Sequence, residues 1–155
     1  MQRRKIMYYS LVVMMVSMLF SAPMSSFAAP AKKASAHQVK TLKQKLVIQV
    51  SDADPKKWAL ALNNAANVQE DLGKENVEVE IVAYGPGLGM LKLESEVGDR
   101  IKGALEGGVK VVACENTMRK QKLSQGDMLP NLSYAKAGVV ELMTKQAEGY
   151  AYIRP

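Results

Sequence analysis

Cys114 is the residue with the most distinctive chemistry, because it is the only cysteine in the 155-residue chain. It follows the apolar run 111–113 and precedes a polar turn and a basic segment that contains Arg119. A strand end that leads directly into a helix start offers free backbone N–H groups, which favour the nucleophilic thiolate. Free cysteines are also common as small buried hydrophobic residues. Position alone therefore leaves a reactive and a structural role equally open.

The single cysteine restricts the chemistry that is possible. It excludes an internal disulfide, a Cys-x-x-Cys redox pair and a thiolate zinc cluster. The only histidine, His37, precedes the region that we expect to fold. A histidine metal site and a Cys–His nucleophile–base pair are therefore not expected. We predict that the protein uses no metal and no organic cofactor.

A glycine-containing loop, Gly85-Pro86-Gly87, is the second candidate for a functional element. Backbone N–H groups in such loops can bind anions. The spacing matches neither the dinucleotide-binding fingerprint nor the Walker loop, which also needs a lysine followed by serine or threonine. A tight turn that needs a positive φ is the favoured interpretation of the local sequence.

Apolar runs alternate with helical spacing along the chain, and this pattern predicts the elements that position these residues. Expected strands cover 45–50, 76–84, 109–113, 132–136 and 149–153. Expected helices cover 55–72 after an Asp54 N-cap, 96–103, a segment from an Asn116 or Thr117 cap towards Leu123, and 138–147.

Alternating strands and helices of this kind predict an α/β fold. We expect a three-layer sandwich, with a mostly parallel five-stranded sheet and helices on both faces, because each parallel connection needs a crossover. The carboxyl ends of parallel strands share one edge of the sheet, where ligands bind. Cys114 and the loop 85–87 are therefore expected to lie at the same edge.

The first 28 residues are typical of a secretory signal peptide. A basic stretch at 3–5 precedes the apolar run 11–20, which is shorter than the about 20 residues that a membrane span needs. Small residues suit signal peptidase cleavage after Ala28. We expect an exported, periplasmic protein without membrane attachment after cleavage, although an uncleaved anchor stays possible. Residues 29–44 are expected to form an exposed linker and 45–155 the folded domain.

The excess of basic residues lies outside the expected domain. The whole chain has a net charge of +6, but residues 46–155 carry slightly more acidic than basic side chains. A nucleic-acid-binding domain needs its basic residues on the fold itself. Nucleic acid is therefore not an expected partner.

Several segments together resemble the DsrE/DsrF-like family, which includes sulfur-relay and YchN-like proteins. They are the first strand and helix, AYGPGLGML after the second strand, VVACENTM after the third, and the closing GVVELMTKQAEGYAYIRP. The resemblance spans roughly Lys45 to Pro155. It implies a flavodoxin-like three-layer fold and assembly into homo-oligomers such as trimers or hexamers. In relay members a cysteine at the strand end carries sulfur as a persulfide, and Cys114 matches that position.

The function implied by this resemblance is that of an exported carrier that accepts and donates sulfane sulfur on Cys114. A sulfur donor or acceptor protein would be its partner. Gly85, Pro86 and Gly87 match the loop beside the cysteine in the family, and with Asn116 and Thr117 they are expected to hold the anionic persulfide.

The expected signal peptide distinguishes this chain from the cytoplasmic relay members, so their roles in tRNA modification and cytoplasmic sulfur oxidation are not expected here. Two alternatives stay open from the residues alone. One is a non-catalytic oligomeric binding or assembly protein in which the cysteine is structural. The other is a binder of a small anion or a nucleotide-like ligand.

Overall fold

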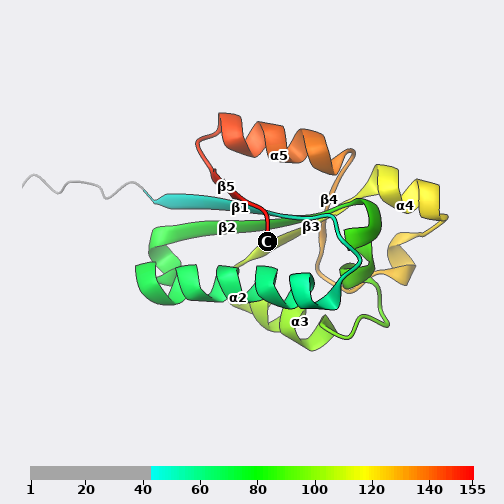
Figure 1. Cartoon of the computed structure of the whole chain (residues 1–155), viewed down its shortest axis with the longest axis horizontal. Coiled ribbons are helices and arrows are strands. Elements are labelled where there is room, and N and C mark those ends of the chain that lie inside the picture. The colour runs from blue at the N-terminus through cyan, green and yellow to red at the C-terminus, as the bar shows by residue number, and fades with distance from the viewer. Residues whose placement is uncertain (1–42) are drawn as a thin grey trace, which may run out of the picture. The chain divides into compact units, whose positions relative to one another are not determined.

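The computed structural model describes residues 43–155, which form an α/β domain around a five-stranded sheet (Figure 1). The strand order is β4-β3-β2-β1-β5, and every pairing is parallel. The predicted fold class is confirmed. The predicted signal peptide, its cleavage site after Ala28 and residues 29–42 of the predicted linker lie outside the described residues.

The sheet contains β1 (Gln44–Val50), β2 (Val77–Ala83), β3 (Lys110–Cys114), β4 (Ser133–Ala135) and β5 (Ala151–Ile153). The α-helices are α2 (Pro55–Leu72), α3 (Gly98–Glu106), α4 (Glu115–Gln121) and α5 (Gly138–Ala147). Short 3-10 helices are η1 (Lys74–Asn76), η2 (Gly85–Leu91) and η3 (Gln125–Asp127). Within residues 43–155, no helix combines the length and the apolar character that a membrane crossing needs.

Helix α2 begins and ends where the sequence predicts. The Asp54 side chain accepts a hydrogen bond of 2.9 Å from the backbone N–H of Lys56. Pro55 occupies the first helical position, where a backbone N–H has no partner within the helix. Gly73, with φ of 84°, follows the last turn. Local capping chemistry therefore sets both ends of this helix.

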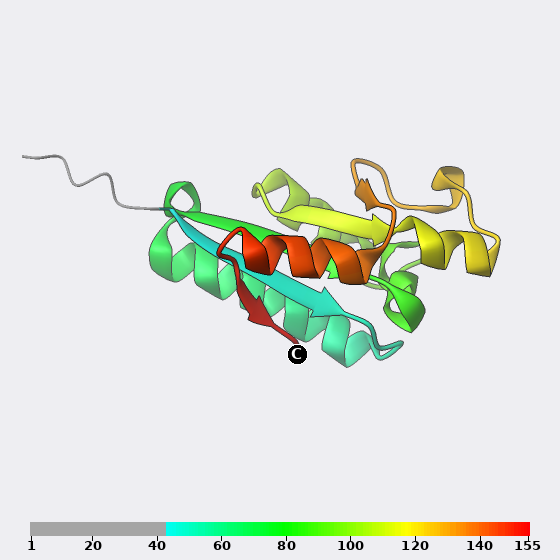
Figure 2. The same cartoon turned by 90° about the horizontal axis from the view of Figure 1, so that it is seen from above.

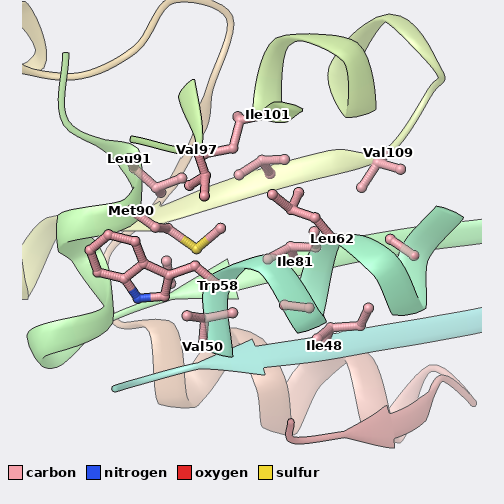
Figure 3. Close-up of a cluster of buried hydrophobic side chains, with 14 of the residues drawn as sticks. Ile48, Val50, Trp58, Leu62, Ile81, Met90, Leu91, Val97, Ile101 and Val109 are labelled. Atoms are coloured by element: carbon pink, nitrogen blue, oxygen red, sulfur yellow. The ribbon is translucent and has the colours of Figure 1, made fainter. Parts of the chain in front are cut away.

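The hydrophobic cores on the two faces of the sheet differ in size. Helices α2 and α3 cover one face and α5 the other (Figures 1 and 2). On the α2 side, Ile48 and Ile81 of the strands pack with Trp58, Leu62 and other buried apolar side chains (Figure 3). The core on the α5 side is smaller, and its buried residues are Val47, Val82, Val112 and Leu142.

Several predicted boundaries need correction. The helix predicted at 96–103 is Gly98–Glu106, and the strand predicted at 109–113 extends to Cys114. The loop 85–87 is the start of the 3-10 helix η2 rather than an isolated turn.

The predicted cap of α4 by Asn116 or Thr117 is wrong. The helix starts at Glu115, directly after the strand, so Cys114 occupies the N-cap position. The two polar side chains have other partners: Thr117 Oγ1 accepts a hydrogen bond from Gly85, and Asn116 Oδ1 accepts one from Arg119.

Candidate functional site

Cys114 is the last residue of β3 and precedes the first turn of α4. Side chains alternate between the two faces along a strand, so Cys114 and Val112 lie on the same face, the one that α5 covers. The side chain is buried, with 4% of the residue exposed. The thiol is thus placed at the carboxyl edge of the sheet, as predicted, but under a helix rather than in an open cleft.

The N-terminus of α5 is in direct contact with the thiol. The backbone N–H of Gly138, the first residue of α5, donates a hydrogen bond of 3.2 Å to Cys114 Sγ. A Cβ at residue 138 would lie 3.0 Å from Tyr84 Cβ and 3.3 Å from Cys114 Cβ. Glycine is therefore the residue that lets the helix terminus come this close. The positive end of the helix dipole also favours the thiolate.

Gly138 was not among the residues that the sequence singled out. The available signal was a glycine at the first position of a predicted helix, close to the carboxyl edge of the sheet. Glycine is not a strong marker for the start of a helix, so the pattern alone did not single out a contact with a residue 24 positions earlier.

Thr117 connects the thiol with the glycine-containing loop. Its Oγ1 accepts a hydrogen bond of 3.0 Å from the backbone N–H of Gly85. The Thr117 hydroxyl keeps its own proton as a donor, because a hydroxyl can accept and donate at once, and it lowers the pKa of the nearby Cys114 thiol. Gln121 Nε2 donates a second hydrogen bond from α4 to the carbonyl oxygen of Gly85, at 3.3 Å. The structure thus brings together Cys114, Thr117 and Gly85.

Opposing effects act on the acidity of the thiol. Burial raises the pKa of Cys114. The Thr117 hydroxyl and the backbone N–H groups of Gly138, Thr117 and Asn116 near the sulfur lower it, and together they outweigh burial. The pKa of Cys114 therefore lies below the ordinary value for cysteine, so a larger fraction of the thiol is in the nucleophilic thiolate form.

The side chain of Asn116 points to a different partner. Its Oδ1 accepts a hydrogen bond from Arg119 Nη2, and its backbone N–H donates to the carbonyl oxygen of Lys136 at 3.1 Å. Both the carboxamide and the backbone N–H of Asn116 therefore have hydrogen-bond partners other than the thiol.

The two glycines of the loop 85–87 have structural roles, Gly85 through its backbone conformation and Gly87 through its packing. Gly85 has φ of 55°, and Pro86 is exposed at the start of η2. A Cβ at Gly87 would lie 2.4 Å from the carbonyl oxygen of Val50, so only glycine fits against the end of β1. Because the Gly85 N–H is bonded to Thr117, it supports the thiol indirectly rather than through an open anion site.

Comparison with known families and structures places this arrangement in context. A model of the DsrE/DsrF-like family matches residues 44–155. Among solved structures, the protein of unknown function MTH1491 from Methanobacterium thermoautotrophicum is 32% identical, with a TM-score of 0.69, and the alignment covers 72% of this chain and 99% of that one.

A second solved structure, the conserved protein of unknown function BT1422 from Bacteroides thetaiotaomicron, is 14% identical, with a TM-score of 0.56. That alignment covers 72% of this chain and 95% of the other, and it supports the fold alone. No curated protein matches the chain. The match over 44–155 and the agreement in fold show that the chain belongs to the DsrE/DsrF-like family.

Proposed function

We propose that this protein is a sulfur carrier that holds sulfane sulfur as a persulfide on Cys114. The observation that carries the proposal is the Gly138 N–H bound to Cys114 Sγ at 3.2 Å, in a site whose hydrogen bonds lower the pKa of the thiol. A thiolate is the form that attacks sulfur. Membership of the DsrE/DsrF-like family points to the same class of chemistry.

The transfer consists of two thiol exchange steps. The Cys114 thiolate attacks the outer sulfur of a donor R–S–SH; the Cys114 S–S bond forms, the donor S–S bond breaks, and R–S⁻ leaves. An acceptor thiolate then attacks the outer sulfur of the Cys114 persulfide and releases the Cys114 thiolate. The carrier is neither oxidised nor reduced over the cycle, and no further reactant is needed.

Access limits this chemistry. Because only 4% of Cys114 is exposed, loading needs a small donor or a local opening beside α5. Among the residues predicted to hold the persulfide, Thr117 is best placed, since its hydroxyl lowers the pKa of the thiol. Gly85 supports Thr117, and Gly87 seats the loop against Val50.

We propose a second copy of the same chain as a partner of the carrier. Val139, Val140 and Met143 form an outward apolar stripe on α5, with exposed fractions of 54%, 55% and 64%. Exposed apolar side chains gathered on one surface are typical of protein interfaces. We further propose that the protein is exported, on the basis of the signal peptide pattern in residues 1–28.

Loading with polysulfide tests the sulfur-carrier proposal. Intact mass spectrometry of the purified protein is expected to show a gain of about 32 Da, one sulfur atom on the thiolate, which a reducing agent reverses. The variant Cys114→Ser is expected to show no gain. An equal gain in Cys114→Ser, or no gain in the wild type, contradicts the proposal; the second outcome favours a structural cysteine in a binding or assembly protein.

A further inference from the structure

Basic side chains gather on the surface beside the buried thiol. The chain segment between Cys114 and Gly138 carries four basic and two acidic residues, a net charge of +2. The acidic residues are Glu115 and Asp127. All four basic residues are exposed, and together they are called the basic surface: Arg119, Lys120, Lys122 and Lys136.

Two of these cations belong to residues that Asn116 holds close to the start of α4. Asn116 Oδ1 accepts a hydrogen bond from Arg119 Nη2, and the backbone N–H of Asn116 donates to the carbonyl oxygen of Lys136 at 3.1 Å. Lys136 directly follows Ala135, the residue that pairs with Cys114 in the register of β3 and β4. Figure 2 shows α4 at the end of β3, beside the first turn of α5. The basic surface therefore lies on the two chain segments that flank the thiol.

The fold leaves these cations without carboxylate partners. Among the described residues, none of the four side chains of the basic surface forms an ion pair. Towards the amino edge of the sheet, by contrast, Lys43, Lys110 and Lys145 each have a glutamate oxygen near Nζ, at 3.9, 3.0 and 2.9 Å. Carboxylates of the protein thus compensate the positive charge at that edge, whereas the charge beside the thiol acts on ions that arrive from solution.

The burial of the thiol restricts which anions benefit from this charge. Cys114 is 4% exposed, so a small reagent reaches Sγ more readily than the thiol of another folded protein does. A thiolate and an anionic sulfur donor repel each other, and this repulsion slows their encounter. Fixed cations near the thiol offset the repulsion and raise the local concentration of small anions.

We propose that the basic surface attracts small anionic sulfur donors of the polysulfide class to Cys114. This inference rests on the proposed carrier function and adds the chemical class of the donor. In the loading step the thiolate attacks an end sulfur of a polysulfide dianion, so that the Cys114 S–S bond forms and one S–S bond of the donor breaks. The rest of the donor leaves as a dianion that is one sulfur atom shorter, so charge and electrons balance without an oxidant.

The size of the effect follows from Coulomb attraction in water at about 50 mM salt. A unit charge about 10–15 Å from a reacting monoanion changes the encounter rate by about 1.2- to 1.4-fold under these conditions. Replacing two lysines by glutamate changes the charge by four units, so the rate of a monoanion is expected to fall about two- to fourfold. The factor for a dianion is the square of this value.

The test measures the rates at which iodoacetate and iodoacetamide alkylate Cys114 at about 50 mM salt. The reagents are similar in size and only iodoacetate is charged, so the ratio of their rates cancels the thiolate fraction and the access to the thiol. The ratio is compared between the wild type, Lys120→Glu/Lys136→Glu and a control of equal net charge, Lys74→Glu/Lys102→Glu. Lys74 lies before β2 at the amino edge of the sheet, and Lys102 lies on α3, which covers the other face.

We expect the iodoacetate-to-iodoacetamide ratio to fall about two- to fourfold in Lys120→Glu/Lys136→Glu and to stay within about 1.3-fold of the wild-type value in the control. Salt at about 0.5 M is expected to lower the ratio of the wild type, because it shortens the Debye length to about 4 Å. This second measurement needs no variant. An unchanged ratio in Lys120→Glu/Lys136→Glu, an equal fall in the control, or a wild-type ratio that does not respond to salt overturns the proposal.

Loading with inorganic polysulfide in the same buffer tests the class of the donor. The initial rate of the gain of about 32 Da is divided by the iodoacetamide rate of the same protein. In Lys120→Glu/Lys136→Glu this quotient is expected to fall by about the square of the iodoacetate factor, because the donor carries two charges. A quotient equal to that of the wild type rejects polysulfide as the donor class. No loading in any of the three proteins, together with the expected alkylation ratios, rejects the carrier function and leaves the attraction of small anions by the basic surface standing.

Discussion

Replacing Gly138 by alanine tests the contact that makes Cys114 a candidate nucleophile. The new Cβ would lie 3.0 Å from Tyr84 Cβ and 3.3 Å from Cys114 Cβ. Both are atoms next to the backbone, which cannot rotate away, so the first turn of α5 has to move outward. The hydrogen bond of 3.2 Å from the residue 138 N–H to Sγ is then lengthened or lost.

The size of the effect follows from the hydrogen bond that is lost. A hydrogen bond to a charged group contributes about 1.5 kcal/mol, which corresponds to roughly tenfold less thiolate at a pH below the thiol pKa. Crowding at the site also lowers the free energy of unfolding by about 1–3 kcal/mol. The two effects are separable, because the first changes the pH midpoint of thiolate formation and the second changes the denaturation curve.

The assay for Gly138→Ala is thiolate absorbance at 240 nm against pH, with urea unfolding measured in parallel. Gly103→Ala is the matched control, since a Cβ at that helical glycine meets no atom within 4 Å. We expect the midpoint of Gly138→Ala to move to higher pH and that of Gly103→Ala to stay at the wild-type value. An unchanged midpoint in a folded Gly138→Ala protein would refute the role given to this N–H.

Three further predictions concern Thr117, the packing of Gly87 and the proposed interface on α5. Thr117→Val removes the hydroxyl between Gly85 and Cys114, so the thiolate midpoint is expected to rise and the free energy of unfolding to fall by about 1 kcal/mol. Thr144→Val, on the exposed face of α5, is expected to change neither the thiolate midpoint nor the free energy of unfolding, and shifts of equal size in both variants contradict the role of Thr117. Gly87→Ala places a Cβ 2.4 Å from the carbonyl oxygen of Val50, so it is expected to lower the free energy of unfolding, measured by urea titration, by about 2 kcal/mol or more. The control Gly126→Ala, with its nearest contact at 3.6 Å, is expected to change the free energy of unfolding by less than about 0.5 kcal/mol. Equal values for the two variants contradict the packing role of Gly87. Met143→Lys places a charge in the outward apolar stripe of α5, so the molar mass measured by light scattering is expected to fall from that of an oligomer to that of a monomer. Thr144→Lys, at an exposed position beside the stripe, is expected to keep the molar mass of the oligomer. A wild-type protein that is already monomeric contradicts the proposed interface.

Features encoded locally could be predicted from the sequence. The alternation of apolar runs and helical spacing gave the α/β class, and Asp54 with Pro55 marked the start of α2. Both depend on residues that are close in the chain, where backbone geometry and hydrogen bonding follow from residue type. The meeting of Cys114 with the loop 85–87 at one edge of the sheet followed from parallel topology.

Features that depend on long-range packing could not be predicted. Nothing local indicates that α5 reaches back from Gly138 to a thiol 24 residues earlier. The alternating valines and glutamates of β2 are typical of a half-exposed strand, yet α5 covers Glu80 and leaves it 2% exposed. The start of α4 could not be predicted for a related reason: the Thr117 hydroxyl is bonded to Gly85, 32 residues earlier, and the Asn116 carboxamide is bonded to Arg119 of the same helix, so neither side chain caps it.

Discharge of sulfur from Cys114 tests the central claim most directly. Protein loaded with polysulfide and freed of excess reagent is mixed with cyanide, and thiocyanate is measured together with intact mass. The Cys114 persulfide is expected to yield about one thiocyanate per loaded chain, since cyanide attacks the outer sulfur and the thiolate leaves, and the mass returns to that of the unloaded protein. Thiocyanate formation that is equal in Cys114→Ser, or a loaded mass that persists in cyanide, would contradict sulfur carriage on this thiol.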